Sequence, residues 1–211
     1  VKEHTDGMIP EILDEIPDEA IMYLVNALAF EAEWTDVYEK HQIREGRFTM
    51  ADGTRQDVDM MHSQEYTYLE DDMATGFMKF YKDNRYALVA MLPNEGVSVQ
   101  QYVNSLTGEH LRSLLNNPQD IIVYASMPKF EMEYDIEMSE VLQEMGMTDA
   151  FDWKIADFSK LGTYNVDGMN ICINRVLHKT YISVTEQGTK AGAATAVEMV
   201  AEGAAEIQEY R

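Results

Sequence analysis

Hydrophobic positions along the chain fall into short runs with the spacing of strands. Residues 23–30 form a nearly continuous apolar run broken by Asn26, which favours a buried strand and leaves a helix as the alternative. Residues 85–92 form a second such run that stops at Pro93, as a strand does. Residues 169–184 alternate apolar and polar positions, which predicts a long strand.

Turn residues divide other segments into paired strands. Residues 47–61 predict a hairpin, because the pair Asp52-Gly53 tolerates the positive φ angles of a tight turn. Residues 121–134 have the composition of a strand and are interrupted at Pro128, which cannot donate a ladder hydrogen bond.

Helical spacing appears in two further segments. Residues 98–115 carry apolar side chains at helical intervals, with a break expected near Thr107-Gly108. Residues 137–145 predict a short helix that ends at Gly146. Strands and short helices mix irregularly and no internal repeat is visible, so the pattern predicts an α+β fold in one domain.

Composition narrows the possible partners. The chain has 38 acidic and 16 basic residues, and its net charge of −22 repels phosphate backbones, so nucleic acid is not expected as a partner. No apolar run approaches the roughly 18 residues of a membrane helix, so no membrane partner is expected. The single cysteine, Cys172, excludes an internal disulfide and lies in an apolar segment, which favours an inert buried thiol.

The sequence contains no recognisable catalytic or metal-binding motif. No HExxH spacing, GxSxG elbow or GxxxxGK[ST] loop occurs in the sequence. The five histidines are also without close metal-ligand spacing: His4, His41, His62, His110 and His178. We therefore expect no cofactor, no metal and no enzymatic activity. An unrelated α+β enzyme is kept as a remote alternative.

The C-terminal segment EQGTKAGAATAVEMVAEGAAEIQEYR, residues 186–211, is rich in small residues. At a period of two, the odd positions form a small-to-apolar face that we expect to point inward: Thr189, Ala191, Ala193, Thr195, Val197 and Met199. The other face carries Lys190, Gly192, Ala194, Ala196 and Glu198. Ala and Gly are poor strand formers, so an exposed loop or helical turn stays open beside the strand.

The stretch EQGTKAGAATAV at residues 186–197 resembles the hinge of the reactive loop in inhibitory serpins. Other segments match that family in the same order along nearly the whole chain: LVNALAFEAEW (24–34), FTMADGTRQDVDMM (48–61), ALVAMLPNEG (87–96), MPKFEMEY (127–134), MGMTDAF (145–151), ADFS (156–159) and VLHKTYISVTEQGT (176–189). The chain is therefore identified as a member of the serpin family, and is most similar to prokaryotic serpins.

The resemblance implies a serpin fold with a large central sheet, smaller sheets, surrounding helices and an exposed reactive loop at the C-terminal end. Residues 1–211 would form a single, partial serpin domain that lacks the N-terminal part and the segment after the loop. Residues 186–211 would be the hinge and a truncated reactive loop. The implied activity is inhibition of serine proteases, and of cysteine proteases as a second class, by suicide-substrate trapping and loop insertion. An extracellular location is expected.

The resemblance also implies roles for individual residues. The hinge would comprise Glu186, Gly188, Thr189, Lys190, Ala191, Gly192, Ala193, Ala194 and Thr195. Lys129 and Glu186 match a pair at the top of the sheet, beside Trp34. Two separate solvated charges and a simple core tryptophan are the alternatives. Asn26 and His178 match a gating pair that we expect to be neighbours, because an unpaired buried polar group costs about 1–3 kcal/mol.

The scissile bond follows from the family spacing. Counting from Glu186 reaches Glu202, and the reactive site would comprise Ala201, Glu202 and Gly203. The preceding Met199, Val200 and Ala201 favour elastase-like or subtilisin-like targets, whereas Glu202 itself would suit a Glu-selective protease. If the loop extends through the acidic residues 204–210, Arg211 becomes a candidate for the reactive site. An arginine there would suit a trypsin-like protease. A non-inhibitory serpin acting as carrier, chaperone or storage protein is the alternative function.

Overall fold

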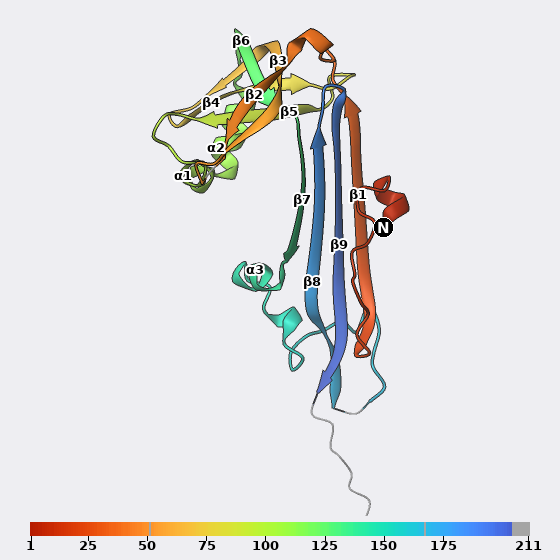
Figure 1. Ribbon diagram of the computed structural model, residues 1–211. Coiled ribbons are helices and arrows are strands. Elements are labelled where there is room, and N and C mark those ends of the chain that lie inside the picture. Colours follow the sequence, from red (N-terminus) through yellow and green to blue (C-terminus); the bar gives the residue numbers. More distant parts are fainter. Residues whose placement is uncertain (51, 167, 204–211) are drawn as a thin grey trace, which may run out of the picture. The chain divides into compact units, whose positions relative to one another are not determined.

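The computed structural model describes residues 1–50, 52–166 and 168–203 (Figure 1). The chain forms two compact units, each described here by itself. One unit comprises residues 1–30, 132–182 and the chain from 190 onward, and the other comprises residues 31–131 and 183–189. The expectation of a single domain stays a prediction.

The long strands form a four-stranded sheet in the order β1-β9-β8-β7. Their bounds are Ala20–Glu33 for β1, Phe130–Glu137 for β7, Met169–Val184 for β8 and Gly188–Gly203 for β9. The arrows in Figure 1 alternate in direction from β1 to β7. Residues 23–30 and 169–184 thus form strands as expected, and the helical alternative for the first is excluded. The expected burial of the first strand is wrong, since Leu24, Val25 and Leu28 are exposed on β1, which lies at the edge of this sheet.

A second sheet has the order β2-β3-β4-β5, with β6 paired to β3. Its strands are β2 (Ile43–Thr49), β3 (Arg55–Glu70), β4 (Ala74–Phe80), β5 (Ala87–Pro93) and β6 (Gln119–Pro128). The predicted hairpin joins β2 to β3, with Thr49 opposite Arg55 and Gly53 at a φ of 84°. The break at Pro128 separates β6 from β7 as expected.

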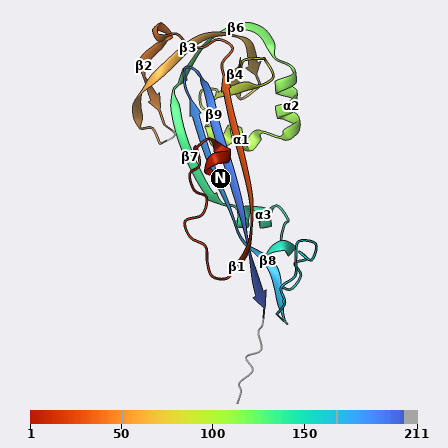
Figure 2. The same cartoon turned by 90° about the vertical axis from the view of Figure 1, so that its right-hand side faces the viewer.

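The helices begin and end where local signals place them. The α-helices are α1 (Val99–Ser105), α2 (Gly108–Asn116) and α3 (Ser139–Glu144), and 3-10 turns span Lys2–Thr5, Lys40–Gln42 and Asp149–Phe151. Ser98 caps α1 by accepting a hydrogen bond from the Gln101 amide, and Thr107 caps α2 in the same way. Asp71 accepts a hydrogen bond from Tyr102 on α1, and its carboxylate lies 2.9 Å from His110 on α2. The two helices lie next to each other (Figure 2).

Two apolar clusters enclose the middle and the end of β9. Ile9 and Ile12 of the N-terminal segment are buried together with Ala194 and Ala196. A second cluster holds Cys172 with Ala156 and Val200. Burial raises the pKa of the Cys172 thiol to about 11, so this thiol is protonated at neutral pH.

The C-terminal segment as far as Gly203 differs from the exposed loop that the resemblance implies. Gly188–Gly203 is not an exposed loop but an interior strand, flanked by β1 and β8. It is held there because neighbouring strands and the N-terminal segment bury its small side chains. The α+β serpin-type architecture itself is confirmed by the solved structures compared below.

The expected inward face of β9 is also corrected. Thr189 is buried and Lys190 is exposed, as predicted. Beyond them the even positions from 192 to 200 are buried, and the odd positions from 191 to 197 are only half-buried. The reason is that the N-terminal segment packs on the even face, where Ala194 and Ala196 meet Ile9 and Ile12. The period of the strand alone could not reveal that covering segment.

Among the described residues, no helix is long and apolar enough to cross a membrane.

Candidate functional site

The hinge begins at an ion pair between Lys129 and Glu186. The Lys129 ammonium lies 2.7 Å from a Glu186 carboxylate oxygen, and each side chain is 30% exposed. The amide of Lys129 also donates a 2.8 Å hydrogen bond to the carbonyl of Asp59 on β3. The Lys129 hydrogen bond lowers the pKa of Glu186. The structure thus brings together the two residues that the resemblance placed at the top of the sheet.

Trp34 donates two hydrogen bonds to the backbone that precedes β9. Its side chain is 1% exposed, and its indole nitrogen donates a 2.8 Å hydrogen bond to the carbonyl of Thr185. Its amide donates to the carbonyl of Gln187 at 2.9 Å. The ring stacks on Tyr81 with centroids 4.5 Å apart, and the Tyr81 hydroxyl donates to Thr189 at 2.8 Å. Trp34 is therefore both a core residue and a contact of the hinge. It thus fits the role that the resemblance implies as well as the alternative of a core tryptophan.

A buried lysine completes this cluster and was missed by sequence reasoning. Lys79 is 2% exposed, and its ammonium lies 2.8 Å from a Glu65 carboxylate oxygen. The same ammonium lies 4.4 Å from the ring centroid of Tyr38 and 5.6 Å from that of Trp34. Burial raises the pKa of Tyr38 to about 12. A charged residue in a strand normally indicates a solvent face, so no sequence signal marked Lys79.

We predict that Lys129→Met weakens the pH dependence of stability. Because Glu186 has a lowered pKa in the folded protein, its ion pair stabilises the fold above the ordinary value of 4.5 and is lost as the pH falls through the lowered pKa. The pair is partly exposed, so the loss at neutral pH should be below about 1 kcal/mol. Urea unfolding of parent and variant at about pH 7 and about pH 3 measures this. An equal difference at both pH values would contradict the prediction.

Two hinge glycines differ in what surrounds them. A Cβ at Gly188 would lie 2.0 Å from the backbone oxygen of Ala32 on β1. A Cβ at Gly192 would lie 3.2 Å from the Cβ of Met8, a tight contact that a shift of a few tenths of an ångström relieves. The close approach of β1 and β9 at Gly188 therefore requires glycine, whereas a methyl group at Gly192 requires only a small shift of Met8.

The other hinge residues follow along β9. Lys190 is exposed, Ala191, Ala193 and Thr195 are half-buried, and Ala194 is buried. Side chains of this size fit between two flanking strands without displacing them.

The expected pairing of Asn26 with His178 is wrong. His178 on β8 lies 2.7 Å from the hydroxyl of Thr195 on β9, measured from its Nδ1. Asn26 is exposed on β1, and β9 separates β1 from β8. The expectation assumed that β1 and β8 are neighbours, whereas β9 lies between them and supplies the partner of His178.

The expected reactive-site residues lie at the end of β9. Ala201 is half-buried, Glu202 is exposed, and a Cβ at Gly203 would meet the backbone oxygen of Gly168 at 2.0 Å. The hypotheses about residues 204–210 and Arg211 lie outside the described residues.

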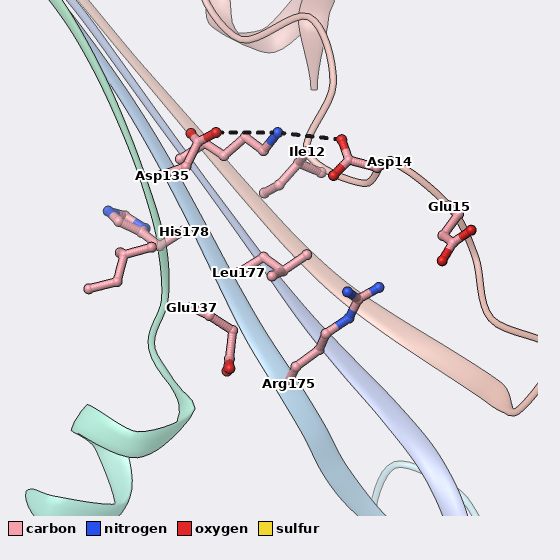
Figure 3. A pocket seen from close by; sticks show the side chains of 10 residues that line it. Ile12, Asp14, Glu15, Asp135, Glu137, Arg175, Leu177 and His178 are labelled. Carbon is pink, nitrogen blue, oxygen red and sulfur yellow. Dashed lines mark ion pairs between the residues drawn. The ribbon is translucent and has the colours of Figure 1, made fainter.

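A polar pocket of about 340 Å³ is formed by the N-terminal segment, β7 and β8 (Figure 3). Lys179 lies across it, 3.6 Å from Asp135 and 3.9 Å from Asp14. This pair of contacts ties the N-terminal segment to the sheet. Within the described ranges, no group of three His, Cys, Asp or Glu side chains is arranged to hold a metal ion.

The site is a strand of small residues that lies between β1 and β8, and the Lys129–Glu186 ion pair and the buried Trp34 hold the start of this strand. The family model described as Serpin (serine protease inhibitor) matches residues 1–210, and the chain belongs to the serpin family.

Sequence relatives agree with this assignment. A serpin-like protein of Thermococcus kodakarensis is 33% identical over 198 residues, covering 93% of this chain and 45% of the relative. Serpin B6 of Macaca fascicularis is 31% identical over 207 residues, covering 95% of this chain and 54% of the relative. The chain thus spans about half the length of these curated relatives.

Solved structures confirm the fold. The thermophilic serpin tengpin in its latent state has a TM-score of 0.87 and 50% identity, covering 95% of this chain and 55% of that one. A loop C-sheet serpin polymer has a TM-score of 0.86 and 47% identity, covering 100% of this chain and 54% of that one. The α+β serpin fold expected from the sequence is therefore confirmed.

Proposed function

We propose that this chain works as part of a full-length serpin that inhibits serine proteases by suicide-substrate trapping. The observation that carries the proposal is the position of β9, since the hinge and the following residues already form an interior strand between β1 and β8. That arrangement is the product expected of loop insertion. The chain's coverage of about half of its relatives supports the view that further sequence completes the inhibitor.

The proposed reaction begins with the protease nucleophile attacking a carbonyl carbon of the reactive site, that of Ala201 or Glu202. The peptide bond to the next residue breaks, the freed amine leaves with a proton, and an acyl link joins the cut end of the hinge to the enzyme. The released hinge then enters the sheet as the part of β9 that precedes the cut, forms ladder hydrogen bonds on both edges and buries Met199 and Val200. The protease is carried along and distorted before water can cleave the acyl link, so inhibition is a kinetic trap.

The residues before the proposed scissile bond indicate the targets. Met199, Val200 and Ala201 are small or apolar side chains that suit the pockets of elastase-like or subtilisin-like enzymes. Cysteine proteases form a second class of targets in this proposal. The extracellular location of the protein stays a prediction.

Mixing the full-length protein with pancreatic elastase or subtilisin tests the proposal. A trapped acyl-enzyme is covalent, so a complex of the summed mass should survive boiling in detergent. Protease with its catalytic serine blocked should form no such complex. Mass spectrometry of the released C-terminal peptide identifies the bond that was cut. A cleaved loop without any complex, with every serine and cysteine protease tried, would favour the non-inhibitory carrier, chaperone or storage alternative.

A further inference from the structure

A glutamate lies fully buried in the inserted strand. Glu198 of β9 is 0% exposed, although the strand around it consists mostly of small and apolar residues. An isolated buried carboxylate is strongly unfavourable and requires partners that satisfy its oxygens. The contacts of Glu198 therefore decide whether its burial hinders or supports the inserted strand.

The partners of Glu198 come from both flanking strands. The Tyr23 hydroxyl on β1 donates to Oε2 of Glu198 at 2.5 Å. On β8, the Asn174 amide donates to Oε1 at 2.6 Å, and the Arg175 guanidinium donates to Oε2 at 3.0 Å and 2.9 Å through two nitrogens. Both carboxylate oxygens are thus occupied, and Arg175 supplies the opposite charge (Figure 3 shows Arg175 beside the polar pocket).

The balance of these contacts favours the charged carboxylate. Burial by itself raises the pKa of Glu198, yet the hydrogen bonds from Tyr23, Asn174 and Arg175 lower it overall. Charge-assisted hydrogen bonds are about twice as strong as neutral ones, and here they form on both edges of one strand. Glu198 therefore enters the sheet as an anion that has a ready-made set of donors.

We propose that Tyr23, Asn174 and Arg175 form a carboxylate-binding site that receives Glu198 when the loop inserts and fastens β9 to both of its neighbours. This inference rests on the proposed function and deepens it, because it names a residue that determines how far the strand must enter. Residues 191–194 of β9 are alanine and glycine and carry no charged group, whereas the Glu198 carboxylate meets its charged and polar donors at one register of the strand. The site stabilises the inserted state and has no occupant from the loop before insertion.

Melting of the loop-cleaved and the uncleaved full-length protein tests the site. Glu198→Ala should lower the melting temperature of the cleaved protein by roughly 5 °C or more, because Arg175 is left without its partner. The uncleaved protein should melt as the parent does. A matched control is Glu133→Ala, since Glu133 is an exposed carboxylate on β7 of the same sheet; it should shift neither form.

A double-mutant cycle makes the test specific. Arg175→Ala alone should lower the melting temperature of the cleaved form, and Arg175→Ala combined with Glu198→Ala should lower it by less than the sum. In a protease-trapping assay, Glu198→Ala should also raise the number of inhibitor molecules consumed per trapped protease severalfold relative to the parent. Equal shifts in cleaved and uncleaved protein, or a cleaved Glu198→Ala protein that melts with the Glu133→Ala control, would overturn the proposal.

These outcomes separate the site from the inhibitory function. Loop cleavage by any protease is enough to form β9, so the melting comparison does not require a trapped complex. A parent that is cleaved without trapping would contradict the inhibitory proposal alone. A parent that traps protease while Glu198→Ala leaves the cleaved form unchanged would contradict the carboxylate site alone.

Discussion

Gly188→Ala is expected to convert the full-length protein, which we propose to be a protease inhibitor, largely into a protease substrate. A Cβ at Gly188 would lie 2.0 Å from the Ala32 backbone oxygen and 2.9 Å from the Glu33 Cα, so β1 and β9 could not pair there without moving. These atoms belong to the backbone of a paired strand, which cannot move aside as easily as the end of a flexible side chain. Overpacking of this kind costs about 1–3 kcal/mol, which slows insertion by roughly 5- to 150-fold if it is felt in the insertion step.

The outcome is measured by the partition between trapped and released protease. Slower insertion gives deacylation more time, so Gly188→Ala should yield mainly cleaved loop and free enzyme. Gly192→Ala is the matched control, since its Cβ would lie 3.2 Å from the nearest atom, the Cβ of Met8, a contact that a shift of a few tenths of an ångström relieves. It should trap protease nearly as well as the parent. Equal trapping by both variants would show that the contact with Ala32 does not form during insertion.

Much of the architecture was accessible from the sequence. Local signals placed the hairpin at Gly53, the break before α2 at Thr107 and the end of α3 at Gly146, because each depends on the chemistry of one or two neighbouring residues. The hinge pair Lys129 and Glu186 was found through the family resemblance, and the structure brings these residues to 2.7 Å.

The predictions that the structure corrects depend on contacts between distant parts of the chain and not on local residue chemistry. Whether residues 188–203 form a loop or a strand depends on which strands flank them, and Ala and Gly commit weakly to either state. The inward face of β9 depends on Ile9 and Ile12, which are far away in sequence. The partner of His178 depends on the same arrangement of strands, since Thr195 reaches it because β9 lies beside β8.

Buried charges were the features that sequence reasoning missed. Glu198 and Lys79 were assigned to exposed positions or passed over, because a charge in an alternating strand usually faces solvent. Each is buried beside partners from other strands: Glu65 for Lys79, and Tyr23, Asn174 and Arg175 for Glu198. Such pairs depend on tertiary contacts that no local pattern encodes.

Lys79→Ala is expected to lower the free energy of unfolding of the full-length protein by about 3–5 kcal/mol. The Lys79 and Glu65 side chains are 3% and 12% exposed, and removing the lysine leaves the Glu65 carboxylate buried without its counter-charge. The ammonium also loses its place over the Tyr38 ring at 4.4 Å, an interaction worth up to about 2 kcal/mol where water is excluded. Urea unfolding followed by tryptophan fluorescence measures the loss.

Lys82 provides a control with the same chemistry and a different environment. Its ammonium lies 3.0 Å from Glu33, but the two side chains are 71% and 60% exposed, so solvent screens the pair. Lys82→Ala should cost less than about 1 kcal/mol. The double variant Lys79→Met with Glu65→Leu should recover most of the stability lost in Lys79→Ala, because it leaves no unpaired buried charge. Similar losses for Lys79→Ala and Lys82→Ala, or a double variant no more stable than Lys79→Ala, would show that burial of the Lys79–Glu65 pair does not govern its contribution.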